Sequence, residues 1–146
     1  MSDSELVVRP YSLEALREMS IASLKAVDNF EVSVPGCGKL RWPGLTDVTA
    51  LVGILPRVVQ FKPHEVRVYS DSVLEKPLPG EGLNKRCLYT MENVWARDRA
   101  TGEYLVDAKS IAAFRAQLLR KADKMGARMI EYDAQKGEWT IEVAHF

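Results

Sequence analysis

Hydrophobic and polar positions repeat with two different periods along this chain, and the change of period separates expected helices from expected strands. Apolar residues recur at helical spacing over residues 12–27 and again over residues 107–125. Ser12 and Asp107 stand at the starts of these stretches, and both residue types cap helix N-termini with a side-chain oxygen. We therefore expect two helices, the first of which is either continuous or broken near Ser20.

Elsewhere apolar and polar residues alternate, as they do along half-buried strands. The expected strands lie at residues 30–34, 39–42, 58–61, 65–69, 86–95, 129–132 and 138–143. Pro43-Gly44 is expected to end the second of them, and residues 77–84 are rich enough in turn formers to form a loop. Hairpin-joined strands flanked by helices predict the α+β class with a mainly antiparallel sheet.

Length and composition point to one domain. The chain has 146 residues, of which 47% are hydrophobic and 27% charged, so it can bury a core without disulfides or metal. Twenty basic and 20 acidic residues leave a net charge of zero, which argues against direct binding to nucleic acid or an anionic membrane. No apolar run reaches membrane-spanning length. We expect one domain over residues 1–146, with residues 1–8 a flexible lead-in that is no signal peptide.

Common motifs for metals, cofactors and phosphate are missing. Cys37 and Cys87 lie far apart, and with His64 and His145 as the two histidines we expect neither a metal site nor a cofactor. The cysteines fit buried positions in a reducing compartment. Residues 79–85 are rich in glycine, but they lack the spacing of a phosphate loop and precede a strand instead of a helix.

Three features of the sequence have ordinary structural interpretations. The three tryptophans are expected to be core anchors, with an aromatic binding platform as the alternative: they are Trp42, Trp95 and Trp139. The basic end of the second helix is expected to be a solvated patch, and so is the turn at His64. Composition and periodicity alone therefore lead to an intracellular α+β domain.

The end of the chain carries a more specific signal. Residues 130–133 and 137–146, which end in His145-Phe146, resemble the last hairpin of the nucleoporin autoproteolytic domain, the C-terminal folded part of GLFG-repeat nucleoporins. Further matches lie at residues 10–12, 27–32, 38–42, 80–85 and 92–95, so the resemblance covers nearly the whole chain. Arg86, Cys87 and Ala96 depart from the family pattern, which indicates a divergent member.

The resemblance implies a serine-type self-cleavage directly after Phe146, and this chain would be its spent product. A Ser after Phe146 is the family's nucleophile, and it attacks the Phe146 carbonyl in an N-to-O acyl shift. His145 would act as the general base. Strand alternation places His145 on the face of Trp139 and Ile141, next to a dry interior, and turns Phe146 into an apolar pocket on the other side.

The oxyanion of this reaction needs a hydrogen-bond donor. The loop before the strand at residues 86–95 offers backbone N–H groups, the Asn84 amide and the Lys85 ammonium. A plain connection between strands is an equally open interpretation of this loop.

The family also implies a place and partners. Its members belong to the nuclear pore complex in the nucleus, where the processed domain anchors a GLFG-repeat nucleoporin by docking to other pore scaffold proteins and supports nucleocytoplasmic transport. The fragment released by cleavage is a further expected partner. The alternative is a non-cleaving protein–protein interaction module of the same fold. A turnover enzyme with a small-molecule pocket would need a second polar cluster, which the sequence does not offer.

Overall fold

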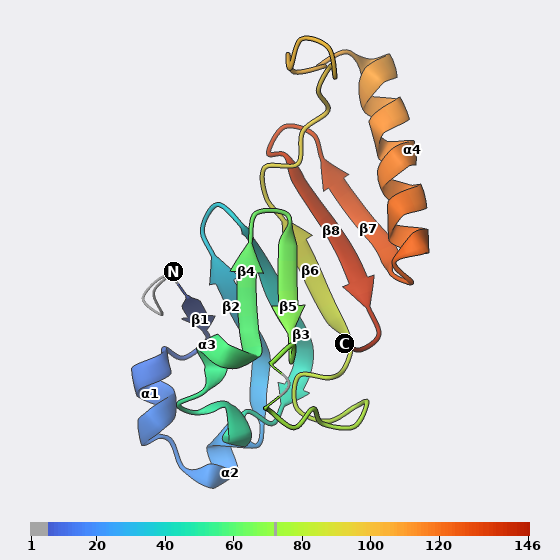
Figure 1. Ribbon diagram of the computed structural model, residues 1–146. Coiled ribbons are helices and arrows are strands. Elements are labelled where there is room, and N and C mark those ends of the chain that lie inside the picture. The colour runs from blue at the N-terminus through green and yellow to red at the C-terminus, as the bar shows by residue number, and fades with distance from the viewer. Residues whose placement is uncertain (1–5, 72) are drawn as a thin grey trace.

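A six-stranded antiparallel sheet forms the centre of the computed structural model, which describes residues 6–71 and 73–146 (Figure 1). Its strands are β1 (Val7–Arg9), β2 (Val27–Val34), β3 (Gly38–Thr46), β6 (Cys87–Met91), β7 (Arg128–Asp133) and β8 (Glu138–Val143). They lie in the order β1-β2-β3-β6-β8-β7. A separate hairpin pairs β4 (Val59–Lys62) with β5 (Glu65–Val68). The predicted α+β class with a mainly antiparallel sheet is confirmed.

The helices are short except for the last one. They are α1 (Leu13–Glu18), α2 (Ile21–Leu24), α3 (Leu55–Val58) and α4 (Ala108–Lys124), with a 3-10 turn at Thr49–Leu51. Ser12 Oγ accepts the N–H of Ala15 at 3.1 Å, and Ser20 Oγ accepts the N–H of Ser23 at 3.2 Å. Because each serine starts its own helix, the expected first helix is divided near Ser20.

Several expected boundaries differ. Residues 7 and 8, expected in a flexible lead-in, belong to β1, where Val8 is buried opposite Val32; residues 1–5 of that lead-in lie outside the described part. Pro43-Gly44 does not end its strand, since β3 continues to Thr46. The register between β2 and β3 shifts there, and a bulge is where a strand tolerates a proline. Strand β6 ends at Met91, so residues 92–95, which were expected to continue it, lie outside the strand.

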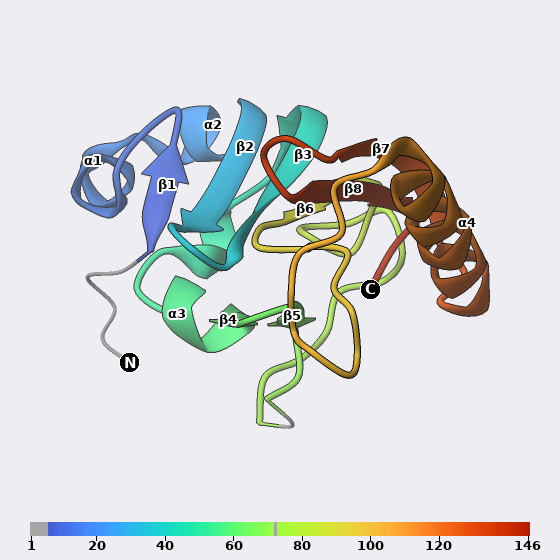
Figure 2. The same ribbon diagram turned by 90° about the horizontal axis from the view of Figure 1, so that it is seen from above.

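The layers pack around the large sheet. The β4–β5 hairpin and α3 lie over one face, and α4 lies beside the β7–β8 hairpin (Figures 1 and 2). The largest fully buried side chains are Trp42, Trp139, Phe30, Leu40, Leu55, Leu83 and Ile141. Helix α4 buries Leu118 and Ala122, whereas Met125, expected in the same apolar stripe, is 51% exposed. Across residues 6–71 and 73–146, no helix combines the length and apolarity needed to cross a bilayer.

Candidate functional site

The chain end departs from the strand pattern just before the candidate catalytic residues. Strand β8 ends at Val143, Ala144 lies in a bend, and the His145 side chain is exposed. Side chains alternate between faces only while the backbone stays extended in the sheet. The expectation that His145 continues the buried face of Trp139 and Ile141 is therefore wrong.

Phe146, in contrast, is held firmly against the domain. Its backbone N–H donates a hydrogen bond to Asn84 Oδ1 at 2.7 Å. Its half-buried ring packs against Trp42, with ring centroids 6.2 Å apart and planes tilted by 51°. The surroundings of Phe146 are apolar as expected, but the side is not the expected one. The strand register places Trp42 on the same sheet face as Trp139 and Ile141, so the expectation that Phe146 turns to the opposite side is wrong.

The Asn84 side chain is buried and fully oriented by its two partners. Its Nδ2 donates to the carbonyl oxygen of Pro77 at 2.8 Å, while its Oδ1 accepts from Phe146. A carbonyl can only accept and a backbone N–H can only donate, so both contacts require the same orientation of the amide. In this arrangement Asn84 contacts the backbone of Phe146 through its acceptor, which is the opposite of an oxyanion donor.

The loop that carries Asn84 is held by the core on both sides of Leu83. Trp42 Nε1 donates to the Leu83 carbonyl at 3.0 Å, and the Leu83 N–H donates to the Tyr69 hydroxyl at 3.1 Å. Burial raises the pKa of Tyr69, so this acceptor stays an uncharged phenol across the neutral range. Two hydrogen bonds therefore tie this segment to the core, one through the N–H and one through the carbonyl of Leu83.

Most backbone donors offered by this loop are already used. The N–H of Gly80 donates to the Asn84 carbonyl at 2.7 Å, and the N–H of Asn84 donates to the Glu81 carbonyl at 3.0 Å. With the Leu83 N–H bound to Tyr69, three loop donors are engaged inside the loop and its support. Of the backbone N–H groups expected as oxyanion donors, those of Leu83 and Asn84 are thus engaged elsewhere.

The Lys85 ammonium, expected as a possible oxyanion donor, is bound to another group. Its Nζ donates to the carbonyl oxygen of Leu45, and burial lowers the pKa of its ammonium. The structure therefore brings Asn84 together with Phe146, while the Lys85 ammonium is engaged at the end of β3.

Sequence reasoning missed Tyr69 and Pro77, and it did not relate Trp42 to the chain end. Tyr69 lies 14 positions before Leu83, and Trp42 lies 41 positions before it, so no local spacing relates them. Within residues 6–71 and 73–146, no group of three or more His, Cys, Asp and Glu side chains is placed to hold a metal ion.

Comparison with protein families and curated relatives gives consistent matches. Residues 4–146 match the family described as Nucleoporin2, the Nup98-96 autopeptidase S59. Nuclear pore complex protein NUP98A of Arabidopsis thaliana is 36% identical over 122 residues, which cover 84% of this chain. Nucleoporin NUP145 of Saccharomyces cerevisiae is 32% identical over 143 residues, which cover 92% of it. The matched part is 11% of the length of each relative.

Solved structures share the fold. The C-terminal domain of nuclear pore complex component NUP116 from Candida glabrata gives a TM-score of 0.79 at 23% identity, covering 99% of this chain and 92% of that one. A chain of the yeast heterotrimeric Nup82-Nup159-Nup116 nucleoporin complex gives a TM-score of 0.78 at 25% identity, covering 99% of this chain and 98% of that one.

Proposed function

This chain belongs to the Nup98-96 autopeptidase S59 family of nucleoporins, and we propose that it is a self-cleaving domain whose cleavage site directly follows Phe146. We further propose that the processed domain docks on other nuclear pore proteins. The two parts rest on different observations and are tested separately.

One observation carries the cleavage proposal. The hydrogen bond from the Phe146 N–H to Asn84 and the packing of its ring on Trp42 hold the residue whose carbonyl would be attacked. Fixing a reacting group relative to its nucleophile removes much of the entropic cost of reaction. Asn84 acts in this proposal as a positioning residue for the scissile bond, and Trp42 forms the apolar seat of the Phe146 ring.

The proposed reaction uses the hydroxyl of a Ser that directly follows Phe146. Its Oγ bonds to the Phe146 carbonyl carbon, and His145 takes the hydroxyl proton. The C–N bond between Phe146 and the Ser then breaks as the nitrogen gains a proton, which leaves an ester and a free amine. Water hydrolyses the ester, giving the Phe146 carboxylate and regenerating the Ser hydroxyl. No cofactor or metal enters these steps.

The docking proposal rests on the relatives. A chain with the same fold and 25% identity is part of the yeast Nup82-Nup159-Nup116 complex. We propose that this domain likewise binds other nucleoporins and anchors its protein at the nuclear pore, in support of nucleocytoplasmic transport. The fragment released by cleavage is a further proposed partner.

The exposure of His145 favours a second candidate, a non-cleaving docking module of the same fold. A general base is expected to lie beside the nucleophile that it deprotonates. An exposed histidine is equally compatible with a chain end that has no catalytic role. Both candidates share the fold and the docking role, so cleavage alone separates them.

An intact-mass experiment separates the two candidates. The chain is extended past Phe146 with its natural continuation and a C-terminal tag, and a His145→Ala variant is prepared in parallel. Self-cleavage predicts a product that ends at Phe146, and the variant stays uncut. Full-length mass in both proteins, with far-ultraviolet circular dichroism of a folded domain, would leave the docking module. Cleavage of both proteins would exclude His145 as an essential base.

A further inference from the structure

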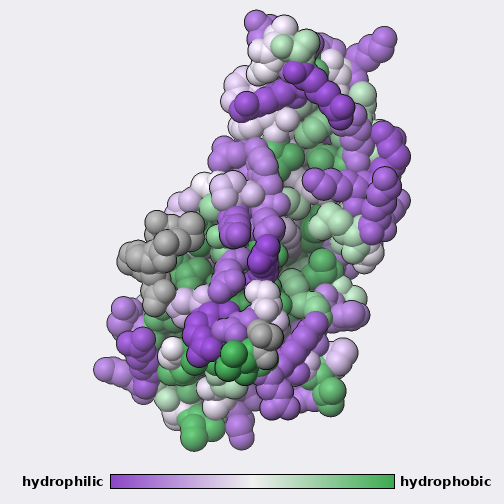
Figure 3. All heavy atoms as spheres, in the orientation of Figure 1, coloured by the Kyte–Doolittle hydropathy of each residue, from purple (hydrophilic) through white to green (hydrophobic). Residues whose placement is uncertain are grey.

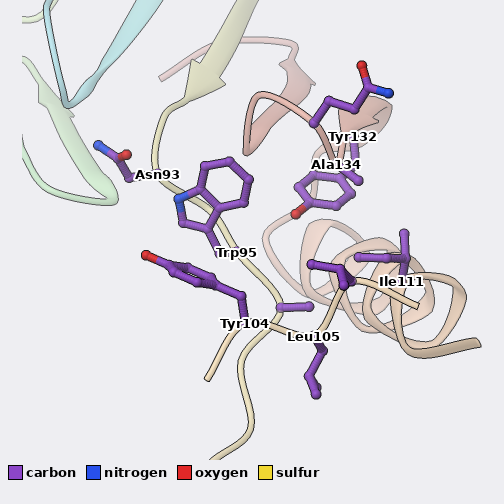
Figure 4. A pocket seen from close by; sticks show the side chains of 10 residues that line it. Asn93, Trp95, Tyr104, Leu105, Ile111, Tyr132 and Ala134 are labelled. Atoms are coloured by element: carbon purple, nitrogen blue, oxygen red, sulfur yellow. The ribbon is translucent and has the colours of Figure 1, made fainter. Parts of the chain in front are cut away.

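A hollow of about 740 Å³ lies between the segment after β6, the start of α4 and the β7–β8 turn (Figure 4). Its lining is largely apolar and aromatic and includes Trp95, Tyr104, Leu105, Ile111 and Tyr132. Tyr104 is 56% exposed, and the neighbouring Val106 is 85% exposed. The hollow therefore leaves Tyr104 and Val106 largely open to solvent.

The aromatic wall of this hollow is held in place. The Trp95 and Tyr104 rings meet edge to face with centroids 5.8 Å apart. Arg97 donates to the Tyr104 hydroxyl at 2.7 Å and stacks over its ring at 4.5 Å. Gly137 lies against the Trp95 indole so closely that an added Cβ would be 2.5 Å from the ring. A wall fixed before binding keeps the entropic cost of association low.

A second hollow continues the first one and shares Asn93 and Trp95 with it. It extends along α4 past Phe114 and Leu118 and is bordered by the charged side chains of Arg97 and Lys121. Figure 3 shows green apolar atoms between purple ones in the upper part of the molecule, over the segment after β6 and α4. We call the two joined hollows the α4 groove.

Charge is distributed unevenly around the α4 groove. Helix α4 carries five basic side chains, Lys109, Arg115, Arg120, Lys121 and Lys124, against the single acidic Asp123, which makes 5 − 1 = +4. The residues that line the groove include Arg97 and Lys121 but neither Asp nor Glu. The whole chain is neutral, so a groove lined by two cationic side chains and by no carboxylate is positive relative to the chain as a whole.

We propose that the α4 groove binds an acidic peptide segment of a partner protein, with apolar side chains of the segment seated against Trp95, Tyr104 and Ile111. Apolar anchors in a preformed groove supply affinity, and complementary charges at the rim orient the segment and speed its association. The inference deepens the docking part of the proposed function and rests on it.

The α4 groove is separate from the chain end. The part of it that holds Trp95 lies at the start of β8, against Gly137, whereas Phe146 follows the other end of that strand (Figure 1). Strand β8 spans six residues, or about 20 Å at roughly 3.4 Å per residue. Binding in the groove is therefore distinguishable from binding at Phe146.

The test selects ligands without assuming their sequence. A phage-displayed library of random peptides is panned against the immobilised chain, and enriched peptides are synthesised with a fluorescent label for anisotropy titration. We expect Asp and Glu together with Leu, Phe, Tyr or Trp in the enriched peptides. Lys121→Glu is expected to weaken binding by about tenfold or more, whereas Lys124→Glu, the same change outside the groove lining, has a much smaller effect.

Nuclear magnetic resonance shifts of backbone amides then locate the bound peptide. Shifts centred on Trp95, Tyr104 and Ile111 support the proposal. Peptides enriched in basic or uncharged residues, or equal losses in the two lysine variants, overturn it. Shifts centred on Phe146 and Asn84 overturn the proposed groove site but remain compatible with the docking function. Failure to enrich any peptide counts against the groove site and against the docking function. Unchanged thermal unfolding of the variants shows that loss of binding is not loss of fold.

Discussion

The backbone nitrogen of Phe146 and the side-chain oxygen of Asn84 lie 2.7 Å apart, joined by a hydrogen bond across 62 positions of sequence. The same asparagine is tied through its nitrogen to Pro77, so the loop before β6 and the chain end form one hydrogen-bonded unit. The Phe146 carbonyl therefore sits beside a support that belongs to the core and not to the end of β8.

Replacement of this support is expected to affect both stability and cleavage. Asn84→Ala leaves the Phe146 N–H and the Pro77 carbonyl without their partner, which lowers the free energy of unfolding by about 1–3 kcal/mol. In the chain extended past Phe146 with Ser, we expect slower cleavage at a temperature where the variant is folded. Urea unfolding and timed intact-mass spectra measure the two effects.

Asn93→Ala is the matched control for Asn84. Asn93 also donates from its side chain to a backbone carbonyl, that of Gly36 at 3.0 Å, but its side chain is exposed and remote from Phe146. Its cleavage rate is expected to stay near wild type. A folded Asn84→Ala chain that cleaves as fast as wild type would remove Asn84 from the reaction.

The Gly137 position tests how tightly Trp95 is seated. Gly137→Ala forces a Cβ to within 2.5 Å of the indole, at a backbone φ of +66°, so we expect a loss of about 1–3 kcal/mol in the free energy of unfolding. Gly102→Ala, at φ +75°, meets nothing within 4 Å. Since both changes share the unfavourable φ, the difference between their denaturant midpoints isolates the contact with Trp95. Equal losses would show that the indole moves freely.

Glu142 should make stability depend on acid pH. Its carboxylate accepts from Arg86 Nε at 2.6 Å and from Arg128 Nε at 3.2 Å, and these hydrogen bonds hold its pKa below the usual value. Their stabilisation is complete above the ordinary glutamate pKa of about 4.3 and is lost as the pH falls through the lower folded value. Both arginines are more than half exposed, so we expect a contribution under about 1 kcal/mol.

Urea unfolding at several pH values measures this contribution. The difference in stability between wild type and Glu142→Gln should be constant from neutral pH down to about pH 5 and should shrink below it. Glu138→Gln, on the same strand and without an ion pair within the described residues, should show no such change. A difference that is constant down to pH 2 would mean that the arginines do not stabilise the carboxylate.

Cys87 is expected to be inert while the domain is folded. Its side chain is fully buried, and burial raises the pKa of its thiol, so little of the reactive thiolate forms at pH 8. In a Cys37→Ser variant, Cys87 should not react with Ellman's reagent over minutes but should react completely in guanidinium chloride. Rapid reaction of the native variant would indicate that β6 opens frequently.

The sequence predicted the elements of this fold better than their ends. Alternation identified β2 and β8, and capping residues identified the starts of α1 and α4. The predicted end of β3 was wrong because β3 carries a bulge between Trp42 and Leu45, opposite Asn29, and a bulge is a property of the pairing and not of either strand alone.

The sequence predicted part of the candidate site, and it did so through the resemblance to the nucleoporin family. His145 and Phe146 came from the family pattern, and the structure joins Phe146 to Asn84, one of the loop residues named with them. The predicted orientation of His145 was wrong because a bend at Ala144 ends the strand, and with it the alternation of side chains between the two faces. Tyr69 and Trp42 support the site from distant positions, and no local pattern marks such contacts.

The position of β8 in the sheet has a consequence for the order of events during synthesis. This strand lies between β6 and β7 although it follows both in sequence. Until β8 leaves the ribosome, β7 has no strand to pair with in the large sheet, whereas β1, β2, β3 and β6 can already pair with one another. The proposed cleavage after Phe146 therefore requires the last interior strand to be in place, and we expect a chain whose β8 is not paired to stay uncut.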